Sequence, residues 1–167
     1  MQLRGGDRRS AGRSDHVARM ISREPRLFAQ LVAGLWSEDP LLRMRVADAA
    51  EKATRSSPGL LQPYKKELLR LLTESHQQEV RWHLAAMIPR LALTVNERHR
   101  VAGILASYLE DRSSIVKTCA LQGLAELARK DVSLRAPVIE LLRRSLRGGT
   151  PAMKARSRRL LATFEEE

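Results

Sequence analysis

The 167-residue sequence contains a single cysteine, Cys119, and aromatic residues make up only 4% of it. One cysteine excludes an intramolecular disulfide, a CxxC redox pair and a cysteine zinc site. Uninterrupted apolar segments are also missing: no run approaches the ~18 residues of a membrane span, and the amino-terminal MQLRGGDRRSAGRSDH lacks the apolar core of a signal peptide. We therefore expect a soluble, cytoplasmic protein with no membrane association.

Histidines are few, and none of the four shares metal-ligand spacing with another. They are His16, His76, His83 and His99. Runs of strand-forming residues are lacking too, so no Gly-rich phosphate loop follows a strand. We accordingly expect no metal, no cofactor, no small-molecule substrate and no enzymatic activity.

Apolar residues make up 43% of the chain, and Leu and Ala lead among them. Both residues favour helices, whereas Val, Ile, Thr and Tyr favour strands. The composition therefore predicts an all-α protein. Its length suits one domain or one short run of stacked repeats.

The clearest internal pattern is a repeat of 36 to 37 residues, in which an apolar residue precedes a basic one. The pairs are Met44-Arg45, Val80-Arg81, Val116-Lys117 and Met153-Lys154. Turn or cap residues stand six positions before each basic residue, namely Asp39, Ser75, Asp111 and Gly148. The period predicts pairs of antiparallel helices, each joined by a tight turn.

Signals for helix starts and ends agree with this division. Asp39-Pro40 and Thr150-Pro151 are cap-then-proline pairs, and Thr94 with Glu97 fits a capping box. Gly148-Gly149 marks the end of the first helix of the fourth unit. Pro89 is expected to kink the second helix of the second unit.

The second helices of the last three units share an apolar stripe with the spacing of one buried face. It comprises Val80, Leu84, Met87 and Leu91, then Val116, Ala120, Gly123 and Leu127, then Met153, Ser157, Leu160 and Phe164. In the first unit the same columns would bury Asp48 and Glu51. A stripe of Leu42, Val46, Ala49, Ala50 and Ala53 fits better there, as in an atypical end repeat.

The hairpin length and the turn Asp followed by Val-Arg or Val-Lys, best met by Asp111 and Val116-Lys117, resemble the HEAT-repeat family of armadillo-type helical proteins. The predicted fold is therefore an α-solenoid of about four HEAT-like hairpins. A single domain would span residues 14–164, with units at about 24–57, 58–93, 94–130 and 131–164 and a short covering helix at 14–21. Residues 1–13 are expected to be a disordered basic tail, and 165–167 an acidic end.

The resemblance implies a curved superhelix that binds macromolecules on the concave surface lined by its second helices. We expect a non-catalytic scaffold for a protein or peptide partner. The candidate partner-binding residues are Arg43, Arg45, Asp48, Arg81, Trp82, His83, Lys117 and Arg158. The basic residues of the repeat form a column of Arg45, Arg81, Lys117 and Lys154. Two interpretations stay open for this basic column: a structural ladder between neighbouring repeats, or contact with a ligand. Two also stay open for Trp82: a platform for a ligand, or packing against a neighbouring helix. Trp36 is expected in the core.

The formal net charge of +11 makes nucleic-acid binding the main alternative. The excess is concentrated at the ends: residues 131–164 carry eight basic against two acidic residues. A third possibility is an enzyme resembling HEAT-like DNA glycosylases, with Asp48 beside Trp82, Arg81 and Lys117. The simpler interpretation is that Arg45 and Lys52, three and four residues away on one helix, neutralise Asp48.

Overall fold

A computed structural model describes residues 13–166, and every regular element in that part of the chain is a helix. This confirms the all-α prediction. Most of the predicted basic tail and the last acidic residue lie outside the described residues. No helix between residues 13 and 166 is both long and apolar enough to cross a bilayer. The chain forms two compact units, the first ending at Leu91 and the second beginning at Ala92.

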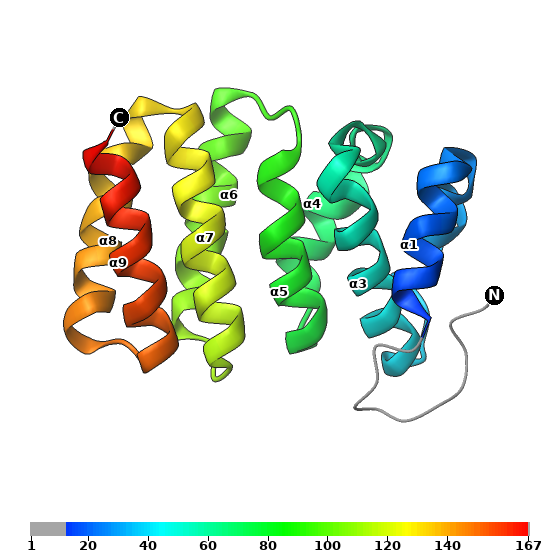
Figure 1. The fold of residues 1–167 in the computed structure, drawn as a ribbon, viewed down its shortest axis with the longest axis horizontal. Coiled ribbons are helices and arrows are strands. Elements are labelled where there is room, and N and C mark those ends of the chain that lie inside the picture. Colours follow the sequence, from blue (N-terminus) through cyan, green and yellow to red (C-terminus); the bar gives the residue numbers. More distant parts are fainter. Residues whose placement is uncertain (1–12, 167) are drawn as a thin grey trace. The chain divides into compact units, whose positions relative to one another are not determined.

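In the first unit, α3 packs between α1 and α5, while α2 and α4 pack against α3 and α5 respectively (Figure 1). The elements are α1 (Ser14–Arg23), η1 (Pro25–Leu27), α2 (Phe28–Gly34), α3 (Pro40–Ser56), η2 (Pro58–Tyr64), α4 (Lys65–Glu74), α5 (Gln78–Met87) and η3 (Ile88–Arg90), where η denotes a 3-10 helix. The predicted covering helix is thus present as α1, two residues longer than expected.

In the second unit, α7 packs against α6, α8 and α9, and α8 packs against α9. The elements are α6 (Val95–Ser107), η4 (Tyr108–Glu110), α7 (Ser114–Lys130), η5 (Val132–Leu134), α8 (Arg135–Gly148) and α9 (Pro151–Glu165). Consecutive helices therefore pair in both units, as the period predicts.

The predicted caps form. The Asp39 carboxylate accepts a hydrogen bond from the Leu41 amide at 2.9 Å, and Thr94 with Glu97 makes the reciprocal capping box. α8 ends at Gly148 and is followed by Gly149. A Cβ atom on Gly149 would lie 2.4 Å from the Ser145 carbonyl oxygen, so this close approach requires glycine.

The apolar stripes are buried as predicted, and α3 uses the alternative stripe. Leu42, Val46, Ala49, Ala50 and Ala53 are each no more than 4% exposed. The three aligned stripes of α5 to η3, α7 and α9 are likewise buried throughout. The repeat pattern thus identifies the core of each unit, because apolar burial follows helical periodicity.

Two predictions about the fold were wrong. Trp36 is 42% exposed, with the Arg70 guanidinium 5.0 Å from the ring centroid. Because α2 already ends at Gly34, the helical column that was expected to bury Trp36 does not extend to it, and Leu35 is buried instead. Pro89 does not kink a continuing helix, since α5 ends at Met87 and Pro89 lies in η3.

Candidate functional site

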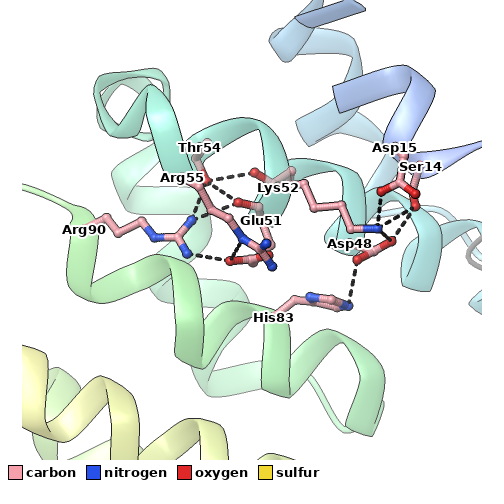
Figure 2. A network of polar contacts seen from close by, with 10 residues as sticks. Ser14, Asp15, Asp48, Glu51, Lys52, Thr54, Arg55, His83 and Arg90 are labelled. Carbon is pink, nitrogen blue, oxygen red and sulfur yellow. Dashed lines mark hydrogen bonds and ion pairs between the residues drawn. The ribbon is translucent and has the colours of Figure 1, made fainter. Parts of the chain in front are cut away.

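The main polar cluster of the first unit is centred on α3. Glu51 and Lys52 follow Asp48 on this helix by three and four residues, and Arg55 follows them by four and three, so all four lie along one side of it. Figure 2 shows how α1, α5 and η3 bring further polar groups to them. We call this cluster the α3 network, which comprises Ser14, Asp15, Asp48, Glu51, Lys52, Thr54, Arg55, His83 and Arg90.

Lys52 joins α1 to α3. Its Nζ lies 2.6 Å from Asp15 Oδ1 and 2.8 Å from Asp48 Oδ2, and Ser14 donates its hydroxyl hydrogen to the Asp48 carboxylate. Burial lowers the pKa of Lys52, but hydrogen bonds to Asp15 and Asp48 outweigh it and leave the pKa raised. The hydrogen bond and positive charge of Lys52 in turn lower the pKa of Asp15. Lys52 is therefore a charged bridge between the two helices.

Glu51 joins α3 to η3. Arg90 Nη2 lies 2.5 Å from Glu51 Oε1, and Arg55 Nη2 lies 2.6 Å from Oε2. Arg90 Nη1 also donates to the Glu51 carbonyl at 2.9 Å and to Thr54 Oγ1 at 3.0 Å. Burial raises the pKa of Glu51, yet hydrogen bonds from the two arginines dominate and leave it lowered. An ionised Glu51 with a side chain only 6% exposed is thus held by two cations.

His83 joins α5 to the same cluster. Its Nε2 atom is 3.9 Å from Asp48 Oδ1, and its side chain is 13% exposed. Burial lowers the pKa of His83, and the nearby Asp48 and Glu51 charges offset this only in part. His83 is consequently neutral near pH 7, and the three carboxylates of the α3 network face three cations. The Trp82 ring lies beside His83, with centroids 5.6 Å apart.

These contacts brace α1 and η3 against α3. Lys52 and Ser14 already occupy the Asp48 carboxylate, which a general base would have to offer to a substrate. Among residues 13–166 no group of His, Cys, Asp and Glu side chains could hold a metal ion. The expected pairing of Asp48 with Lys52 is present, although the Asp48 side chain is only 15% exposed.

The predicted basic column has mostly internal roles in the first unit. Arg45 is 1% exposed, which contradicts its assignment to a partner-binding surface. Arg81 Nε donates to the Ser75 carbonyl at 2.8 Å, in the turn before its own helix. Arg43 Nε donates to Gln77 Oε1 at 2.9 Å, so it joins the starts of α3 and α5. These side chains hold turns and helix ends in place.

The same column behaves differently in the second unit. Lys117 and Lys154 make no hydrogen bond or ion pair with other residues in 13–166, so no ladder forms at these two positions. Lys117 lines a cavity of about 230 Å³ together with Met153. Arg158 is exposed on α9. α9 turns Arg156 toward α7, where it donates to Gln122 at 2.7 Å, and Arg158 lies on the far side of the helix.

The structure therefore brings His83 to both Asp48 and Trp82. Lys117 faces a cavity that α8 and α9 line, whereas Arg158, on the corresponding side of α9, is exposed. Sequence reasoning missed Glu51 and Arg90 as network members. The spacing of Glu51 to Arg55 could have predicted one ion pair. Nothing local could have predicted the contact with Arg90, which lies 39 residues further along the chain.

Comparison with known proteins identifies no relative of this chain. No protein-family model matches the chain, and neither a curated protein nor a solved structure matches it.

Proposed function

We propose that this chain is a HEAT-type helical repeat scaffold that binds a protein or peptide partner through the outward residues of its second helices and carries no catalytic activity. Support for the repeat comes from polar contacts between residues that lie slightly less than one period apart. Arg43 with Gln77, Glu110 with Arg144, Gln122 with Arg156, and Arg129 with Thr163 each form a hydrogen bond across 34 residues. Stacked repeats place equivalent helices side by side, because each repeat contacts its neighbours.

The observation that carries the binding proposal is the α3 network beside Trp82. Salt bridges and hydrogen bonds fix α1 and η3 to α3 in the first unit, so this surface is ordered before any partner arrives. A preformed surface avoids part of the entropy loss of binding. Tryptophan is enriched among the residues that dominate binding energies, and Trp82 is partly exposed next to this braced layer.

The non-catalytic part of the proposal is supported by the state of Asp48. Its carboxylate accepts a hydrogen bond from Ser14 and pairs with Lys52, and the nearest imidazole, His83, is neutral and partly buried. A substrate would have to displace these partners before Asp48 could accept a proton. A binding role requires no such rearrangement.

A comparison of the two tryptophans tests the proposal. Wild type, Trp82→Ala and Trp36→Ala would be used as baits in the native cell, and captured proteins would be quantified. Trp36 is the matched control because it belongs to the same unit but is exposed beside α4, where Arg70 covers its ring. We expect Trp82→Ala to lose partners that Trp36→Ala retains, with unchanged helical circular dichroism. Equal recovery by all three baits would refute the placement of the surface at Trp82.

Nucleic-acid binding is the second candidate, and exposed cations of α9 favour it. Arg158 and Arg159 are exposed and form no ion pair with residues 13–166. Electrostatic binding to phosphates weakens steeply with salt. The measurement is the affinity for duplex and single-stranded DNA and RNA as a function of salt, and lack of binding at ~0.1 M salt would remove this candidate.

A further inference from the structure

The second unit exposes a mixed cationic and apolar surface on the side of α8 and α9 that faces away from α6 and α7. On α9, Arg156 points toward α7 and donates to Gln122. Lys154, Arg158 and Leu161 recur at intervals of three and four residues on the opposite side of this helix.

The exposed side of α8 can be located in the same way. Arg144 Nη2 approaches Glu110 Oε1 at 3.3 Å, which marks the side of α8 that faces η4. Ile139, Arg143 and Leu146 lie on the other side, again at intervals of three and four residues. We call the combined surface the end face, which comprises Ile139, Arg143, Leu146, Lys154, Arg158 and Leu161.

The preceding helix pair, α6 and α7, shows what covers the corresponding side of a helix pair in this unit. The equivalent positions, 37 residues earlier, are Ala102, Ala106, Leu109, Lys117, Leu121 and Leu124. Leu121 and Leu124 are 0% and 1% exposed, because α8 and α9 pack over α6 and α7 on this side. In the end face the position of Leu121 is taken by the exposed Arg158, and that of Leu124 by the partly exposed Leu161.

The cations of the end face are available to a ligand. Arg143, Lys154 and Arg158 form no hydrogen bond or ion pair with other residues in 13–166. One carboxylate of the described α9, Glu165, lies on the same side, two turns beyond Arg158. Ile139 and Leu146 are partly exposed, one turn before and one turn after Arg143 on α8, so the face offers apolar contact as well as positive charge.

We propose that the end face binds an acidic amphipathic helix of a partner protein, which lies along α8 and α9. Its apolar side covers Ile139, Leu146 and Leu161, in the place that a helix pair takes on α6 and α7. Its flanking carboxylates pair with Arg143, Lys154 and Arg158. The recognition mode is an amphipathic helix laid along two helices, with interspersed charges that set orientation and partner choice.

The apolar residues distinguish this partner from a nucleic acid. A phosphate backbone requires cations only, and gains nothing from the three aliphatic side chains that lie among them. A helix with leucines at intervals of three and four residues matches both components. The proposal concerns a different surface from that beside Trp82, and it stands or falls independently of the first binding proposal.

The test measures fluorescence anisotropy of a labelled synthetic peptide, with leucines on one helical side and glutamates elsewhere, added to the full chain at ~0.1 M salt. Wild type would be compared with Arg143→Glu/Arg158→Glu. The matched control is Arg100→Glu/Arg112→Glu, which reverses two exposed arginines of the same unit that form no ion pair with residues 13–166, and it changes the net charge equally. A second peptide keeps the glutamates but replaces the leucines by serines.

We expect the end-face variant to weaken binding of the leucine peptide by ~10-fold or more, whereas the control variant changes it less than about 3-fold. The serine peptide should bind wild type at least ~10-fold more weakly than the leucine peptide. Equal losses in both double variants would show attraction by net charge and overturn the proposal. Absence of binding, or duplex DNA that displaces the peptide through Arg143 and Arg158, would overturn it as well.

Discussion

Substitution of Glu51 by glutamine tests the central ion-pair cluster of the first unit. The change keeps the shape of the side chain and removes its charge, so Arg90 and Arg55 both lose their carboxylate. The Arg90 side chain is 20% exposed and that of Arg55 is 64% exposed. Only Arg90 is therefore left with a charge that water cannot readily solvate.

The magnitude follows from this burial. Removing one partner of a buried ion pair costs ~3–5 kcal/mol, whereas an exposed pair contributes ~0–1 kcal/mol. Because Arg90 retains hydrogen bonds to the Glu51 carbonyl and to Thr54, we expect a loss of about 2 kcal/mol in the free energy of unfolding. Glu74→Gln is the matched control, since Glu74 forms an exposed pair with Arg70 at 2.9 Å, and it should cost less than ~0.5 kcal/mol.

The assay is urea unfolding followed by tryptophan fluorescence. Both tryptophans of the chain, Trp36 and Trp82, lie in the first unit, so their fluorescence reports that unit and far-ultraviolet circular dichroism reports all helices. Glu51→Gln should lower the fluorescence midpoint. Equal midpoints for Glu51→Gln and Glu74→Gln would refute the assigned role of the Glu51 to Arg90 contact.

The pH dependence of the free energy of unfolding provides a second measurement on Glu51. Hydrogen bonds from Arg55 and Arg90 overcome the effect of burial and hold the pKa of Glu51 below its ordinary 4.5. The unfolded chain then binds this proton at higher pH than the folded chain does. The stabilisation is present above pH 4.5 and is lost as the pH falls through the lower folded pKa. Glu51→Gln should lack this part of the acid dependence.

Three further predictions concern other positions. Burial lowers the pKa of His83 below 6.5, so this imidazole is protonated at higher pH in the unfolded chain than in the folded chain. The free energy of unfolding should therefore decline as the pH falls below 6.5. His83→Gln should flatten that decline in fluorescence-monitored unfolding between pH 7 and 5. Gly149→Ala should destabilise the second unit by about 2 kcal/mol, because its Cβ would meet the Ser145 carbonyl, whereas Gly148→Ala, whose Cβ meets nothing within 4 Å, should stabilise by ~0.5 kcal/mol. Equal thermal midpoints of the two glycine variants, measured by circular dichroism, would contradict this prediction. Thr94→Ala should lower stability by ~1 kcal/mol through loss of the α6 capping box, and an unchanged thermal midpoint would refute that role.

The failures of sequence interpretation have a common cause. Trp36 was assigned to the core by extending a helical column beyond the point where α2 ends. Arg45 was included in the candidate surface because it lies in the basic column of the second helices, yet it is 1% exposed. In both cases a rule that holds within one helix was extended to a position that packing between helices decides.

Helix positions, caps and apolar stripes were determined by the sequence itself, because they depend on propensities and periodicities within about one turn of helix. Asp39, Thr94 and Gly149 act as the sequence predicts. Tertiary structure alone decided which charges are buried. Glu51 is buried only because folding brings Arg90 to it from 39 residues away, and pairing then offsets the cost of removing both groups from water. The availability of the end face was decided in the same way, by which side of α8 and α9 other helices cover.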